Sequence, residues 1–170
     1  MKTAHVAIGV VVMLLASAGC EPEGTPGSWP LVGRSDVLGA YAASKIRVVG
    51  LSEITNASDN ERTSGVKVYV DLLDSFGNRI KSPGVFRFEL YKFVPRSSEP
   101  KGKRIFIQAE IDLTDATRNN SHWRDFLRTY QFDLDLNFKV KVNDVFMLEV
   151  TFTTPAGKRL RGLFQLEPEK

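Results

Sequence analysis

The chain has 170 residues, of which 42% are hydrophobic and 25% are charged, and its formal net charge is +3. This length suits one globular domain, and the charge is too small to predict a nucleic-acid-binding surface, so we expect no nucleic-acid partner. A single cysteine excludes an intramolecular disulfide, and two histidines are too few for a histidine-rich metal centre.

Residues 1–19 have the three parts of an export signal. Lys2 supplies a positive start, residues 6–15 form an apolar stretch, and small residues follow up to Gly19. The apolar stretch is shorter than the roughly 20 residues that a membrane-spanning helix needs. We therefore expect residues 1–19 to be a signal peptide that is removed on export.

Cys20, the sole cysteine, directly follows these small residues. The run Ala18-Gly19-Cys20 resembles the lipobox of bacterial lipoproteins, with Ser17 where that family usually has leucine. The resemblance implies cleavage before Cys20, lipidation of this cysteine with palmitate-type chains, and anchoring to a membrane of the cell envelope. Glu21 is not the aspartate of an inner-membrane retention signal, which favours the outer membrane if the host has two. The alternative is an ordinary signal peptide with a chance cysteine.

Residues 20–33 are interpreted as a lipidated cysteine and a flexible tether that leads to one domain over residues 34–170. The tether, EPEGTPGSWPLVG after the cysteine, has three prolines and three glycines, as is typical of an extended, solvated linker. Its Trp29 either docks on the domain or lies at the lipid interface. Residues 34–44 are ambiguous, because their apolar residues have helical spacing but Gly39 weakens a helix.

From Lys45 onward, apolar and polar residues alternate, which is the pattern of strands with one buried face. In the stretch 105–113, this alternation places Ile105 and Ile107 on the apolar face and Phe106 on the opposite one. The predicted strands lie within residues 45–54, 66–72, 86–90, 105–113, 130–136, 146–152 and 160–166.

Seven strands with one apolar face each predict an all-β fold, an antiparallel β-sandwich of two packed sheets. Closure of one sheet into a small barrel is the alternative. Turn residues indicate hairpins between the strands. The stretch 154–158 (TPAGK) fits a type I turn with Gly157 in the left-handed conformation, and 74–78 (DSFGN) fits a turn capped by Asp74.

The stretch from Val66 to Phe86 resembles bacterial immunoglobulin-like domains. It has alternating valines, an aspartate, a Gly77-Asn78 turn, and Pro83-Gly84 before the next strand. The resemblance implies an immunoglobulin-like sandwich of about seven strands, and it implies nothing about a ligand.

Residues 121–130 interrupt the β pattern. Four apolar residues from Trp123 to Tyr130 have the spacing of one helical face, which predicts a short helix capped by Asn120 or Ser121. This helix would close one end of the sandwich. The candidate binding surface at that end consists of His122, Trp123, Arg124 and Arg128.

No catalytic set is recognisable, so we expect no enzyme activity, no cofactor and no metal. Ser121, His122 and Asp125 could belong to a hydrolase, but they are crowded into one segment without the glycine-flanked nucleophile of that class. An envelope hydrolase is therefore only the third functional class, after a binding or assembly module and a ligand-binding lipoprotein. Asp133 and Asp135 have an Asp-x-Asp spacing, but outward positions on a strand explain it better than a calcium site.

These observations predict a membrane-anchored envelope lipoprotein that acts as a non-catalytic binding or assembly module. Its expected partners are the membrane, through acyl chains on Cys20, and an envelope protein. The alternative is a ligand-binding lipoprotein that captures a glycan, a peptide or a lipid at the end of the sandwich near His122.

Overall fold

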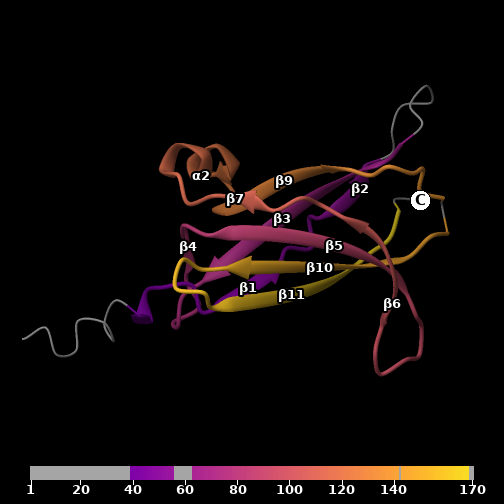
Figure 1. The fold of residues 1–170 in the computed structure, drawn as a ribbon, viewed down its shortest axis with the longest axis horizontal. Coiled ribbons are helices and arrows are strands. Elements are labelled where there is room, and N and C mark those ends of the chain that lie inside the picture. The colour runs from indigo at the N-terminus through magenta and orange to yellow at the C-terminus, as the bar shows by residue number, and fades with distance from the viewer. Residues whose placement is uncertain (1–38, 56–62, 142, 169–170) are drawn as a thin grey trace, which may run out of the picture.

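The computed structural model describes residues 39–55, 63–141 and 143–168. Within these residues, eleven strands form two antiparallel sheets that pack on each other, and helix α2 (Ala116–His122) lies at one end (Figure 1). The predicted all-β sandwich is therefore confirmed. The predicted signal peptide, Cys20 and the tether over residues 20–33 lie outside the described residues.

The first sheet, called sheet A, contains six strands in the order β1-β3-β9-β8, with β2 and β4 also paired to β3. The second, sheet B, contains five strands in the order β11-β10-β5-β6, with β7 also paired to β5. Sheet A is made of β1 (Lys45–Val48), β2 (Glu53–Thr55), β3 (Gly65–Leu73), β4 (Arg79–Ile80), β8 (Trp123–Arg124) and β9 (Thr129–Asp135). Sheet B is made of β5 (Val85–Phe93), β6 (Lys101–Ile107), β7 (Ile111–Asp112), β10 (Phe146–Thr153) and β11 (Arg159–Leu166).

The strand order follows that of immunoglobulin sandwiches. In those domains one sheet has the order A-B-E-D, and the other has C-F-G, extended by C′ in the variable type. Here β1-β3-β9-β8 corresponds to A-B-E-D, and β6-β5-β10-β11 corresponds to C′-C-F-G. The chain passes from sheet A to sheet B after β4 and again after β9, and α2 lies on the return connection between β7 and β8.

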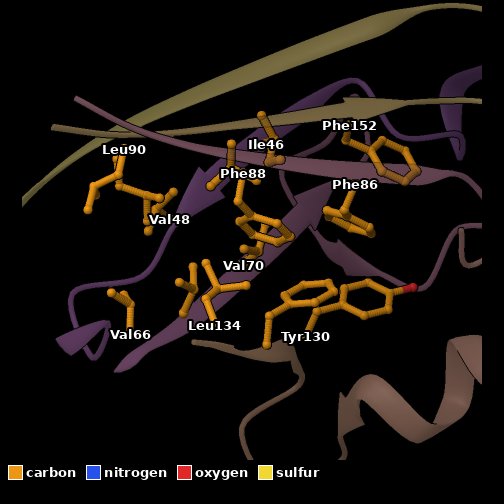
Figure 2. Packing of buried hydrophobic residues seen from close by; sticks show 14 of the residues in the cluster. Ile46, Val48, Val66, Val70, Phe86, Phe88, Leu90, Tyr130, Leu134 and Phe152 are labelled. Carbon is orange, nitrogen blue, oxygen red and sulfur yellow. The ribbon is translucent and has the colours of Figure 1, made fainter. Parts of the chain in front are cut away.

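The core lies between the inner faces of the two sheets (Figure 2). Phe86 and Phe88 from sheet B meet Phe132 from sheet A, with ring centroids 4.9 and 4.7 Å from that of Phe132. Burial of one such side chain stabilises the fold by about 1.5–3 kcal/mol. Tyr130 is the polar member of this core, and its hydroxyl group points toward α2, where it donates to Asn119 Oδ1 at 2.9 Å.

Both predicted turns are confirmed. Gly157 has a φ of +81°, and its amide donates to the carbonyl oxygen of Thr154 at 2.8 Å, which closes the β10–β11 hairpin. In the β3–β4 turn, Gly77 has a φ of +86°, and Asp74 Oδ1 accepts hydrogen bonds from the amides of Phe76 and Asn78 at 2.9 and 2.8 Å. Burial raises the pKa of Asp74, but these hydrogen bonds, led by those from Asn78, outweigh it and hold the pKa below its usual value.

The helix predicted over residues 121–130 is wrong. Helix α2 ends at His122, and its N-cap is Asp115, whose side chain accepts from the Arg118 amide at 2.8 Å. The helical spacing has another cause, because Trp123 on β8 lies opposite Tyr130 on β9 and packs edge-on against its ring at 5.1 Å. Pairing across a short hairpin therefore brings together side chains that the sequence pattern assigned to one helical face.

The face assignment in the stretch 105–113 is wrong for Phe106 and Ile107, whereas Ile105 packs against the core as predicted, and this stretch is not one strand. Phe106 lies opposite Leu90 and packs against the core, whereas Ile107 lies opposite Glu89 and is 46% exposed. The register between β5 and β6 shifts after Leu90, where β6 has one extra residue. A bulge of this kind changes which face the following residues occupy.

Candidate functional site

The structure places His122 at the end of α2 rather than at a helix start. Its ring stacks on Phe132 with centroids 5.0 Å apart, and its Nδ1 lies 3.1 Å from the carbonyl oxygen of Gln131. The side chain is half-buried. Packing of His122 against β9 is therefore enough to account for a histidine at this position.

Arg124 and His122 both contact Gln131. Arg124 Nε donates to Gln131 Oε1 at 2.9 Å, and Arg124 Nη1 donates to the carbonyl oxygen of Ser121 at 2.9 Å. Trp123 packs against the core, and Lys81 Nζ lies 5.1 Å from the centre of its ring. The donors of Arg124 and the ring of Trp123 are thus largely occupied within the domain.

Arg128 lies apart from the other three predicted site residues. It is exposed in the β8–β9 turn with a φ of +53°, and its amide donates to the carbonyl oxygen of Arg124 at 2.7 Å. A positive φ is unusual for a residue other than glycine and is found mainly in turns. The turn therefore accounts for the backbone of Arg128, while its side chain is exposed.

A second group of charged residues lies on the outer face of sheet B. It lines a shallow depression of about 350 Å³ across β5, β6, β10 and β11. We call this surface the charged face. Its charged and aromatic members are Arg87, Glu89, Tyr91, Lys101, Arg104, Glu110, Glu149, Arg159 and Arg161.

Glu89 is the acid at the β5–β6 side of the charged face. It is buried, and its Oε1 accepts from Arg104 Nη1 at 2.7 Å and from Arg87 Nη2 at 3.2 Å. Burial raises the pKa of Glu89, but the hydrogen bonds from Arg104 and Arg87 outweigh burial and hold the pKa below its usual value. Glu89 therefore favours its ionised form between the two guanidinium groups.

Glu149 is the corresponding acid on β10. Its Oε2 accepts from Lys101 Nζ at 3.0 Å, and its Oε1 lies 3.8 Å from Arg161 Nε. The hydrogen bond to Glu149 raises the pKa of Lys101, whose ammonium group also lies 5.2 Å from the centre of the Tyr91 ring. Lys101 is therefore fixed between a carboxylate and an aromatic ring.

The two acids face one another across paired strands. Glu89 on β5 lies directly opposite Glu149 on β10, and like charges in this position destabilise a sheet. The surrounding cations offset this repulsion, and they exceed the acids in number. Among the described residues, Arg159 has no acidic group within ion-pair distance, and Arg161 approaches Glu149 only at 3.8 Å with a side chain that is 66% exposed.

Sequence reasoning missed the charged face, although part of its signal was visible. Arg87 and Glu89 alternate with the core residues of β5. Arg159 and Arg161 lie at the corresponding exposed positions of β11. The alternation by itself indicates only that these positions face away from the core. Strand order was needed to bring β6, β5, β10 and β11 side by side.

Comparison with protein-family models and with curated proteins finds no match for this chain. Among the described residues, no three histidine, cysteine or acidic side chains are grouped so that they could hold a metal ion. Over the same part of the chain, none of the helices has the length and apolar character needed to cross a bilayer. The case for function therefore depends on the geometry of the surfaces.

Proposed function

We propose that the chain is an exported, lipid-anchored protein with an immunoglobulin-like sandwich, which acts as a non-catalytic binding or assembly module of the cell envelope. Its binding surface is the charged face, and its partner there is an anionic surface of an envelope protein. The observation that carries this proposal is the surplus of guanidinium groups around two buried, paired carboxylates on a hollowed sheet face.

The geometry of the charged face suits an anionic partner. Arg159 and Arg161 are two residues apart on one strand, so their side chains leave the sheet about 7 Å apart on the same face. Each guanidinium group presents a planar fork of donors that matches a carboxylate. Glu89 and Glu149 hold the neighbouring cations in place, which lowers the entropic cost of ordering these side chains on binding.

Binding to immobilised heparin, used as a polyanionic probe, tests the charged face. The double variant Arg159→Ala/Arg161→Ala removes two contacts worth about 0.7 kcal/mol each, so we expect roughly tenfold weaker binding. Lys139→Ala/Lys141→Ala is the matched control, because it removes the same charge from two exposed residues between β9 and β10. Equal loss in both variants contradicts a binding role for the charged face.

Labelling with a palmitate analogue tests the anchor separately. The lipobox resemblance supports a labelled protein that loses its label in Cys20→Ala. A protein without label, or one whose label survives this substitution, contradicts anchoring through Cys20. The charged face is unaffected by that result, because the two experiments read different properties.

Capture of a small glycan, peptide or lipid near His122 is the second candidate function. The exposed side chain of Arg128 supports it, while the internal contacts of Arg124 and His122 weaken it. Pull-down from solubilised envelopes separates the two candidates. A stoichiometric protein partner that is lost in Arg159→Ala/Arg161→Ala favours assembly, and a glycan or lipid partner that is lost in Arg128→Ala favours capture.

A further inference from the structure

Three exposed aromatic side chains lie at the end of the sandwich where the described chain begins. Tyr41 is 62% exposed in the segment before β1, Phe76 is 66% exposed in the β3–β4 turn, and Phe126 is 97% exposed in the β8–β9 turn. The other exposed large hydrophobic residues of the described chain are aliphatic: Leu51, Val94, Ile107 and Leu163. We call the three aromatic residues the aromatic tip.

Direct contacts join these loops. The rings of Tyr41 and Phe76 have centroids 5.7 Å apart, and the amide of Ser75 donates to the carbonyl oxygen of Ala40 at 3.1 Å. Arg79, just after the β3–β4 turn, donates from Nη1 to the carbonyl oxygen of Leu127 at 2.9 Å. The three loops are therefore neighbours on one end of the molecule.

Neither turn needs its aromatic residue for its own geometry. In the β3–β4 turn, Asp74 and Gly77 supply the cap and the positive φ, and Phe76 contributes only its amide. In the β8–β9 turn, the amide of Arg128 closes the turn, and Phe126 is almost completely in contact with water. Exposed apolar groups on neighbouring loops are a feature of protein and membrane contacts.

The position of the tip relative to the predicted anchor favours a membrane contact. Figure 1 shows that the described chain begins at the end that carries α2, β4 and the β10–β11 turn, whereas β11 ends at the opposite end. Roughly 19 residues separate Cys20 from Gly39, and a chain of this length spans at most about 65 Å. An anchor on Cys20 therefore leaves this end of the sandwich within reach of the bilayer.

The charges of the same end suit an anionic lipid surface. Lys45 at the start of β1, Arg128 in the β8–β9 turn and Lys158 in the β10–β11 turn are all exposed. Asp125 is the exposed acid of the β8–β9 turn, and Lys81 Nζ lies 3.7 Å from its Oδ1. Basic side chains near a bilayer are attracted to anionic headgroups, and aromatic rings favour the interfacial region.

We propose that the aromatic tip inserts into the headgroup region of the bilayer that holds the Cys20 anchor, so that the sandwich stands with its chain-entry end on the membrane. The inference rests on the proposed lipid anchor. Its consequence is that the strands of sheet B extend away from the membrane, with the β10–β11 turn nearest to it, which leaves the charged face open to a partner in the envelope.

Fluorescence quenching by lipids tests this orientation. The acylated chain is reconstituted into vesicles of phosphatidylethanolamine and phosphatidylglycerol that contain a lipid with a quencher near its headgroup. Phe126→Trp reports on the tip, and Leu51→Trp, in the turn between β1 and β2, is the matched control. The signal of the same chain without the added tryptophan is subtracted, because Trp29 and Trp123 also fluoresce.

We expect quenching of the Phe126→Trp signal to be at least threefold greater than that of Leu51→Trp. Equal quenching, or none for Phe126→Trp, overturns the orientation even if the chain is acylated. If palmitate labelling shows no acylation, the proposed anchor fails, and the chain is then coupled at Cys20 to a maleimide lipid so that the same comparison still decides the orientation. A photoreactive group at position 126 that crosslinks to an envelope protein instead of lipid also overturns it.

Discussion

Two regions of the molecule carry basic side chains: helix α2 with strand β8, and the charged face of sheet B. They differ in how far the fold itself binds the donors of these side chains. In the first region, the guanidinium group of Arg124 donates to Gln131 and Ser121, and His122 stacks on Phe132. In the second, Glu89 and Glu149 fix part of the cations, and Arg159 has no acidic partner among the described residues. A cation is available to a ligand only where the fold leaves its donors free.

The largest expected effect lies in the first region. Asn119 is buried, donates from Nδ2 to the carbonyl oxygens of Leu113 and Ser82 at 2.9 and 3.0 Å, and accepts from the Tyr130 hydroxyl. Asn119→Ala leaves several buried polar groups without partners, so we expect the free energy of unfolding to fall by about 3 kcal/mol. Urea denaturation measures this loss.

Asn120→Ala is the control for that substitution. Asn120 is exposed, and its Oδ1 accepts from Lys81 Nζ at 2.8 Å, so the expected loss is below about 0.5 kcal/mol. A similar loss for Asn119→Ala and Asn120→Ala would show that the buried network does not hold α2 in place.

The next effect lies in the charged face and depends on pH. The folded-state pKa of Glu89 is below its usual value, so this group adds stability above pH 4.5 and loses that contribution as the pH falls through the folded pKa. Glu89→Gln should therefore lower the free energy of unfolding by about 1 kcal/mol at pH 7. The difference from the wild type should narrow toward pH 3.

Urea denaturation at several pH values measures this profile. Lys101 contributes in the opposite sense, because its raised pKa adds stability that is lost only as the pH rises through that value, far above the range used. A difference between Glu89→Gln and the wild type that stays constant from pH 7 to pH 3 contradicts the ion pairs assigned to Glu89.

An effect of similar size on stability is expected at His122. His122→Ala removes the ring that stacks on Phe132, while β9 and the Tyr130–Asn119 hydrogen bond remain. We expect the free energy of unfolding to fall by about 1 kcal/mol, with heparin binding unchanged. Urea denaturation measures the stability, and elution from immobilised heparin measures the binding. Weaker heparin binding without a loss of stability would show that His122 takes part in binding.

The smallest effect is expected at Arg124. Its Nε and Nη1 donate to Gln131 and Ser121, so Arg124→Ala should leave heparin binding unchanged, whereas Arg161→Ala should weaken it about threefold. Both variants lose one positive charge. Equal weakening in the two variants means that the probe reads net charge and does not recognise the charged face.

The sandwich could be predicted from the sequence because its signals are local. Alternation in the stretch 66–72 and the turn residues Asp74, Gly77 and Gly157 indicate structure within a few positions along the chain. The wrong predictions come from residues whose position depends on a distant partner. The bulge in β6, opposite Leu90 and Tyr91, places Phe106 on the inner face of sheet B. Pairing with Tyr130 places Trp123 on a strand.

The candidate site shows the same limit. The sequence favoured His122, Trp123, Arg124 and Arg128 because they are close together along the chain. The charged face combines residues of β5, β6, β10 and β11, and its acids Glu89 and Glu149 meet only after the chain has passed to sheet A and back. Cross-strand charge pairs of this kind follow from strand order, which the sequence pattern does not specify.

Chemical-shift mapping with a heparin tetrasaccharide tests the central claim most directly, because it reports on both regions in one spectrum. We predict that the amide signals of β10 and β11 around residues 149–163 shift on titration, while those of residues 119–128 do not. Shifts confined to residues 119–128, with β10 and β11 unchanged, would contradict the assignment of the charged face as the binding surface.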